Sequence, residues 1–159
     1  MKKIMVQAVW VFLSLSAFAT GPNIAFPGTK FVDAKGHETE ANLIFDSNQK
    51  SLVVLVAAKA FAEIPYSSID KVSYEYSKHH RLEQGAIVMA ASLGAGAVVM
   101  LTKSKSHWLY VDYHEGVVAK TLVLRMDKKE YKQILQTAKA ETGKEIEFMG
   151  DAGKPEASK

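Results

Sequence analysis

A long uncharged segment in the middle of the chain limits the folds that this sequence can adopt. Residues 84–102 contain no charged side chain and consist largely of Ala, Gly, Val and Met. Strand-like runs lie on both sides of this segment, and a two-stranded hairpin alone is only marginally stable in water. The strands before and after the segment therefore need each other to form one core, and the segment is expected to leave and re-enter a single domain.

The central part of this segment, residues 85–101, has the composition of a membrane-contacting or closely packed helix. A helix of this length measures about 25 Å, which is short for crossing a hydrocarbon core of about 30 Å. Ala86, Ala90 and Gly94 recur every fourth residue and would form a stripe along which helices approach closely. We expect an apolar helical insert over residues 82–102, with this stripe as its face for membrane contact or self-association.

Three arrangements of residues 85–101 stay open. The segment could span the bilayer, which makes the chain a small integral-membrane protein but divides the core that the flanking strands share. It could instead enter a bilayer, or pack on a second copy, as a helix or helical hairpin from one side of the domain. It could also pack on the surface of its own domain. The last two arrangements both keep the domain intact, and the sequence does not separate them.

Seven short runs of strand-forming residues are separated by turn signals. Most are bounded by Gly, Asn, Asp or Ser, and several alternate between apolar and polar residues as half-buried strands do. One run, residues 51–58, is apolar on both faces, as expected of a buried central strand. The expected strands are residues 30–33, 40–46, 51–58, 61–66, 71–76, 106–113 and 117–126.

The C-terminal part of the sequence predicts one amphipathic helix. Asp127 stands at the N-cap position, and Glu130 three residues later completes the pattern of a capping box. Gly143 provides a C-terminal stop, and residues 149–159 have a composition that predicts disorder. Between these limits an apolar stripe recurs at helical spacing. It contains Tyr131, Ile134, Leu135 and Ala138.

Seven strands followed by one amphipathic helix resemble the pleckstrin-homology (PH) superfold, in particular the bacterial PH-like and GRAM-like domains. The resemblance covers residues 30–148 and includes the stretches Ile64–Ile69, Lys105–Leu109 and Thr142–Lys144. It implies a mainly β fold with one α-helix, a seven-stranded β-sandwich or open barrel that the C-terminal helix caps. The apolar insert would then lie between the fifth and sixth strands. The resemblance also implies an exported protein without a catalytic signature.

Phosphoinositide binding, an activity often attached to PH domains, is not expected here. In the family, this activity needs several basic residues in the loops between the first strands. The corresponding loops of this chain contribute only Lys35 and Lys50. One lysine in each loop is too few to hold a polyanionic headgroup.

The first nineteen residues have the pattern of a secretory signal peptide. Lys2 and Lys3 form its positive region, an uncharged and mostly apolar stretch follows, and Ala17 and Ala19 supply the small residues that signal peptidase requires. An uncleaved N-terminal anchor is the alternative. Residues 20–29 contain Pro-Gly turn signals and are expected to form a linker.

Composition excludes several classes of function. Of the 20 Lys and Arg residues, two belong to the signal segment, so 18 basic residues face 17 acidic ones in the rest of the chain. This balance lacks the clustered positive excess of a nucleic-acid binder. The chain has no cysteine, so an exported fold must be stabilised by its core and not by disulfides.

No pattern in the sequence predicts an enzyme, a metal site or a cofactor site. A Gly-x-Ser-x-Gly motif and a dinucleotide-binding glycine loop are both absent. His79 and His80 are adjacent, and His107 and His114 flank one strand, so these histidines do not form a helical zinc-binding pair. We therefore expect a non-catalytic binding or scaffolding module of the periplasm or cell envelope. Its partner would be a protein, a membrane surface or a second copy of the chain.

The signal-peptide hypothesis predicts cleavage after Ala19. The small residues at positions 17 and 19 fit the two subsites of signal peptidase, so the mature protein should begin at Thr20. Intact-mass measurement on protein isolated from the cell envelope checks this. A mature species that retains Met1 would contradict cleavage and favour an uncleaved anchor.

Overall fold

The computed structural model describes residues 22–33, 36–79, 87–88 and 101–149, with the backbone alone at 78–79, 87–88 and 101–104. These residues are mostly in β-strands, with one α-helix and one short 3-10 helix, so the mainly β fold with one helix is confirmed. The elements are β1 (Ile24–Val32), β2 (Glu38–Asp46), β3 (Ser51–Val56), β4 (Lys59–Pro65), η1 (Tyr66–Ser68), β5 (Ile69–His79), β6 (Ile87–Val88), β7 (Leu101–Glu115), β8 (Val118–Met126), α1 (Tyr131–Thr142) and β9 (Ile146–Met149).

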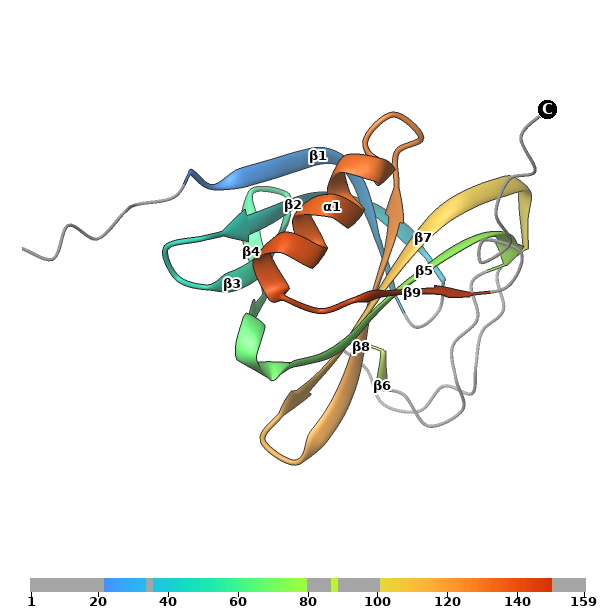
Figure 1. Cartoon of the computed structure of the whole chain (residues 1–159). Coiled ribbons are helices and arrows are strands. Elements are labelled where there is room, and N and C mark those ends of the chain that lie inside the picture. Colours follow the sequence, from blue (N-terminus) through green and yellow to red (C-terminus); the bar gives the residue numbers. More distant parts are fainter. Residues whose placement is uncertain (1–21, 34–35, 80–86, 89–100, 150–159) are drawn as a thin grey trace, which may run out of the picture.

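All nine described strands belong to one sheet that does not close into a barrel. Eight of them follow the order β4-β3-β2-β1-β8-β7-β5-β9, and β6 pairs with β8 outside this path. Neighbouring strands are antiparallel except that β9 runs parallel to β5 and β6 runs parallel to β8. Figure 1 shows the strongly twisted sheet with α1 lying across it, between the β1–β4 half and the half formed by β5, β7 and β8.

The first strand begins six residues earlier than the sequence predicted, at Ile24. Residues 24–29, expected to belong to a linker, therefore belong to the sheet, and the linker prediction was wrong for them. Pro27 and Gly28 lie at an irregularity in the pairing of β1 with β2. A bulge tolerates proline because the missing N–H is not needed for a ladder hydrogen bond.

The helical insert expected over residues 82–102 is not confirmed. Four of its residues are described, and all four lie in strands: Ile87–Val88 form β6, and Leu101–Thr102 open β7. The helix prediction was wrong at these positions, because their backbone groups pair with β8 and β5 instead. Met149, predicted to begin a disordered tail, ends β9. Outside the described residues lie Ala17, Ala19, Ala86, Ala90 and Gly94.

The main core lies on the side of the sheet that faces α1. Alternate residues of the strands point inward, as the period of two in a β-strand requires. The alternation of apolar residues in β5, β7 and β8 brings six side chains into this core, and each is at most 6% exposed. They are Val72, Tyr74, Leu109, Val111, Leu122 and Leu124.

A smaller apolar cluster lies on the opposite face of the sheet and contains Trp108 and Tyr110, the neighbours of inward-facing Leu109. The Tyr110 hydroxyl donates a hydrogen bond of 2.9 Å to the carboxylate of Glu75, which is itself only 4% exposed. A buried carboxylate needs such a donor, since an unpartnered charge in the interior is costly.

The helix is positioned as the sequence predicted, but its start differs in detail. The backbone carbonyl of Asp127 accepts hydrogen bonds from the N–H groups of Glu130 and Tyr131, so the first turn begins at Asp127. One carboxylate oxygen of Glu130 is buried and has no hydrogen-bond partner among the described residues. The reciprocal capping box is therefore incomplete. Gly143 ends the helix in the left-handed conformation, with φ of 68°.

Replacing Leu135 by alanine tests whether the helix stabilises the domain. Leu135 and its neighbour Ile134 are buried in the main core. Leu135→Ala should lower the free energy of unfolding by about 2–5 kcal/mol, as is usual for buried leucines. Denaturant unfolding measures this. The exposed Gln136→Ala is the matched control and should change stability by about 0.5 kcal/mol or less; an equally small effect of Leu135→Ala would show that α1 does not dock.

Candidate functional site

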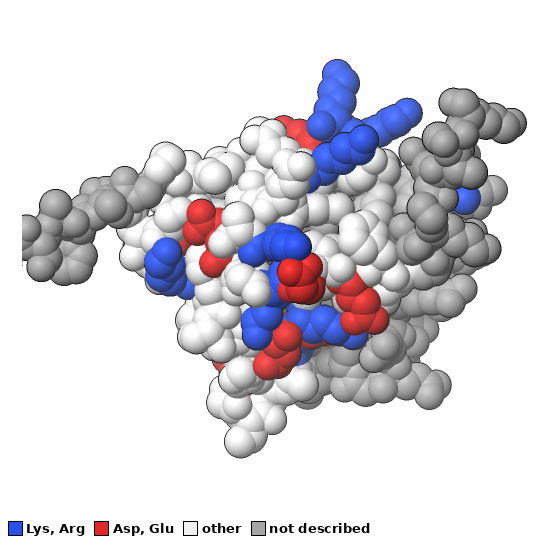
Figure 2. All heavy atoms as spheres, in the orientation of Figure 1, with Lys and Arg blue, Asp and Glu red and all other residues white. Residues whose placement is uncertain are grey.

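A groove of about 280 Å³ lies where β1, β7 and β8 meet the turn that leads into α1. Four cationic side chains from four separate segments line it: Lys30, Lys105, Arg125 and Lys128. The pairing of β1 with β8 places Lys30 directly opposite Arg125. Figure 2 shows basic side chains projecting from the end of the molecule where this turn lies, whereas both signs of charge mix over the middle of this face. We call this feature the basic groove.

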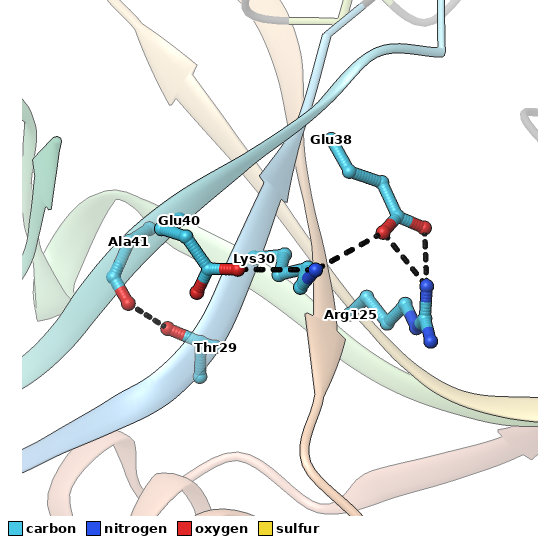
Figure 3. A network of polar contacts seen from close by, with 6 residues as sticks. All are labelled: Thr29, Lys30, Glu38, Glu40, Ala41 and Arg125. Carbon is cyan, nitrogen blue, oxygen red and sulfur yellow. Dashed lines mark hydrogen bonds and ion pairs between the residues drawn. The ribbon is translucent and has the colours of Figure 1, made fainter.

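Two of the four cations are held by carboxylates of β2. Arg125 donates from Nη1 to both carboxylate oxygens of Glu38 at 2.7 Å. The Lys30 ammonium lies 3.8 Å from Glu38 and 3.0 Å from Glu40 (Figure 3). Because the Glu38 side chain is only 18% exposed, this charge pair is poorly screened by solvent. It fixes Arg125 and Lys30 in the groove wall.

The other two cations, Lys105 and Lys128, form no ion pair with a carboxylate of the described residues. The Lys105 ammonium instead lies 5.5 Å from the ring centre of Tyr76. Tyr76 is 39% exposed and also lines the groove. The groove therefore offers two lysines and an accessible aromatic face to a ligand, beside Asp127, an acidic residue that also lines it.

Two aromatic rings, those of Tyr76 and His107, line the groove and continue into a larger stack. His107 stacks between Tyr76, at 4.7 Å between ring centres, and Tyr131 of α1, at 3.8 Å. The Tyr74 hydroxyl lies 2.7 Å from His107 Nδ1. These rings come from β5, β7 and α1, so the stack ties the helix to the sheet beside the groove. We call it the aromatic stack.

Burial determines the protonation of the aromatic stack. It lowers the pKa of His107, and the nearby Lys128 ammonium lowers it further, while Asp127 opposes the shift. Burial also raises the pKa of Tyr74 well above its usual value, with smaller contributions from Tyr131 and Tyr76. Tyr74 thus keeps its proton, and its hydroxyl shares a hydrogen bond with a neutral His107 whose direction is set by the tautomer of the imidazole.

The structure separates the histidines that the sequence singled out. His107 belongs to the aromatic stack, whereas His114 lies at the other end of β7, with its Nδ1 3.0 Å from Asp70. His79 ends β5, and His80 lies outside the described residues. Within the described part of the chain, no group of three or more His, Asp or Glu side chains could hold a metal ion.

Sequence reasoning missed the basic groove. Its cations come from four places along the chain, so no single run of the sequence marks them. The signal that could have revealed them is the alternation in β7 and β8. There Arg125 occupies a position that faces away from the main core, whereas Lys105 is an exposed residue on the same face of β7 as Leu109.

The lowered pKa of His107 predicts a pH-dependent stability. In the unfolded chain this histidine gains a proton below its usual pKa of 6.5, whereas the folded protein resists protonation until a lower pH. The unfolded state therefore binds more protons in this range, and the free energy of unfolding should fall as the pH drops below about 6.5. One group contributes at most ~1.4 kcal/mol per pH unit.

Urea unfolding of the parent protein and of His107→Asn between pH 7 and pH 5 measures this effect. His107→Asn should be less stable at neutral pH and should show a smaller decrease toward low pH. The exposed Gln133→Ala removes no titratable group, so it is the control and should keep the parent slope. An unchanged slope in His107→Asn would contradict the proposed protonation.

Comparison with known proteins does not add an assignment to this geometry. The chain matches no protein-family model, and no curated protein is significantly similar to it. The properties that bear on a function are therefore the charges, the contacts and the exposed ring of the basic groove and the aromatic stack.

Proposed function

We propose that the chain is an exported, non-catalytic binding module that attaches to an anionic membrane surface through the basic groove. The observation that carries this proposal is the position of Lys105 and Lys128. Both are cations without a carboxylate partner among the described residues, and they meet at one groove beside the exposed ring of Tyr76. Phosphate groups are the ligands that such a combination of ammonium groups and a neighbouring guanidinium favours.

The PH-like fold is part of this proposal. The seven strands expected from the sequence correspond to β1–β5, β7 and β8, and α1 follows the last of them. The first four form a meander, the other three form a second group, and the pairing of β1 with β8 joins the two. We propose that these seven strands and α1 make up a PH-like domain, to which β6 and β9 are additions.

The place where the apolar run enters the sheet favours a membrane over a purely protein partner. The uncharged run of residues 85–101 ends at Leu101, where β7 begins, and Lys105 follows four residues later in the same strand. At about 3.3 Å per residue, the two positions are roughly 13 Å apart. Apolar contact combined with basic residues near anionic lipid is the usual basis of peripheral membrane binding.

Two alternatives involve the same apolar run. Self-association through Ala86, Ala90 and Gly94 would use the small side chains as a helix contact, and a spanning segment at residues 85–101 would make the chain an integral-membrane protein. No helix in the described ranges is long and apolar enough to span a membrane. Washing membranes with alkaline carbonate distinguishes these possibilities, because a peripheral module is released and a spanning protein is retained.

Vesicle binding tests the groove directly. The mature protein should co-sediment with vesicles of phosphatidylglycerol and phosphatidylcholine but not with phosphatidylcholine alone, and added salt should weaken the binding. Lys105→Gln and Lys128→Gln should each reduce affinity about fivefold, because each lysine near an anionic surface contributes about 1 kcal/mol.

Lys59→Gln is the matched control, since Lys59 is an exposed lysine at the start of β4 and does not line the groove. It removes the same charge and should change affinity less than twofold. An equal loss in Lys59→Gln would show that only net charge matters. Binding that is independent of phosphatidylglycerol would contradict the proposed function.

A further inference from the structure

His107 is a titratable side chain that lines the basic groove together with Lys105 and Lys128. Lys105 lies two residues earlier in β7, so the two side chains are on the same face of the strand, about 7 Å apart. Lys128 comes from the turn between β8 and α1. Among the described residues that line the groove, His107 is the only histidine, the side-chain type whose usual pKa lies closest to neutral pH. A change of pH can therefore alter the charge of the groove.

The neighbours of the His107 ring suit an imidazolium as well as a neutral imidazole. Tyr76 and Tyr131 stack on this ring, with angles of 23° and 12° between the ring planes. The face of an aromatic ring attracts a cation that lies over it. The Tyr74 hydroxyl lies 2.7 Å from Nδ1 and can accept a hydrogen bond as well as donate one. Protonation of His107 therefore requires no rearrangement of the aromatic stack.

Ionisable groups face His107 from every element packed against it. They are Tyr74 and Tyr76 of β5, Asp127 and Lys128 of the β8–α1 turn, Tyr131 of α1 with Lys132 beside its ring, and Lys105 of β7 itself. The other two cations of the groove, Lys30 and Arg125, are paired with carboxylates of β2.

Positive charge at the groove opposes a proton on His107. The Lys128 ammonium adds to burial in lowering the pKa of His107, and the Asp127 carboxylate opposes the shift only in part. A phosphate group bound between Lys105 and Lys128 would compensate these ammonium groups and bring a negative charge close to the imidazole. Both effects favour the protonated form of the ring.

We propose that His107 acts as a proton-dependent third cation of the anion site in the basic groove, so that affinity for lipid phosphate groups rises as the pH falls below neutral. This inference rests on the proposed function and adds the regulation of the same site. The linkage is reciprocal, because a bound phosphate that favours the proton on His107 must itself be bound more tightly when the proton is present.

Vesicle binding at pH 7.5 and at pH 5.0 tests the proposal. The probe is a vesicle of phosphatidylglycerol and phosphatidylcholine, and the single charge of phosphatidylglycerol stays constant over this range. The affinity of the parent protein should be about three- to fivefold higher at pH 5.0, since one added cation near an anionic surface contributes about this factor. In His107→Asn the ratio of the two affinities should fall close to one.

His114→Gln is the matched control. His114 lies at the opposite end of β7 and does not line the groove, but it also is a histidine that can gain a positive charge. This variant should keep the parent ratio of affinities. An equal decrease of the ratio in His114→Gln and His107→Asn would show that net charge alone causes the effect, and would overturn the proposal.

NMR titration of the His107 ring measures the same linkage in the parent sequence, so it does not depend on the folding of a variant. The soluble headgroup glycerophosphoglycerol should raise the pKa of His107, whereas sodium chloride at equal ionic strength should not. Lys128→Gln should raise the pKa of His107 even without the headgroup, because it removes the ammonium that lowers this pKa. A headgroup that shifts resonances of the groove but leaves this pKa unchanged would contradict the linkage.

The two measurements separate this proposal from the proposed function. Vesicle binding that is equal at both pH values, or a pH dependence that His107→Asn retains, overturns the proposal and leaves membrane attachment standing. A headgroup that raises the pKa of His107, in a protein that does not bind vesicles, supports the linkage but assigns the groove to soluble phosphate diesters. Failure of both vesicles and headgroup to bind overturns both proposals.

Discussion

The fold depends on one short junction between β1 and β8. The sheet order makes this the link between its two halves, yet the strands pair at only two positions, where Lys30 faces Arg125 and Phe31 faces Leu124. The junction is strengthened on one face by the buried apolar pair and on the other by the Arg125–Glu38 charge pair. Removing one partner of a poorly solvated charge pair costs more than the pair contributes, because the remaining charge is left without compensation.

The same junction creates the basic groove. Gly28, just before the paired residues, lets the β8–α1 turn approach β1 closely, since a Cβ atom there would lie only 3.1 Å from the Cβ atom of Asp127. The turn carries Lys128 into the groove, and α1 brings Tyr131 against His107. The residues that line the groove therefore come from both halves of the sheet, and a ligand bound there would contact both.

Alternation and helical spacing were sufficient to predict the seven strands, the helix and its inward face. A strand or helix that buries one face needs apolar residues at a fixed spacing, and this spacing is visible in the local sequence. The same reasoning failed where long-range pairing overrides local preference. Ile87 and Val88 lie in an apolar run typical of a helix but pair with β8. Pro27 is typical of a linker but lies at a bulge in β1. The basic groove was not predictable, since it is assembled from residues distant in sequence.

The two ends of the sheet differ in a way that limits assembly. At one end the short parallel strand β9 covers β5 with four residues, and short edge strands are poor templates for further pairing. At the other end β4 is longer and faces no described strand. A chain with one receptive edge can join a single neighbour through backbone pairing, but it cannot extend in both directions. Among the described strands β4 is therefore the edge better suited to backbone pairing, and pairing through β4 alone would join two molecules and not build a continuous fibre.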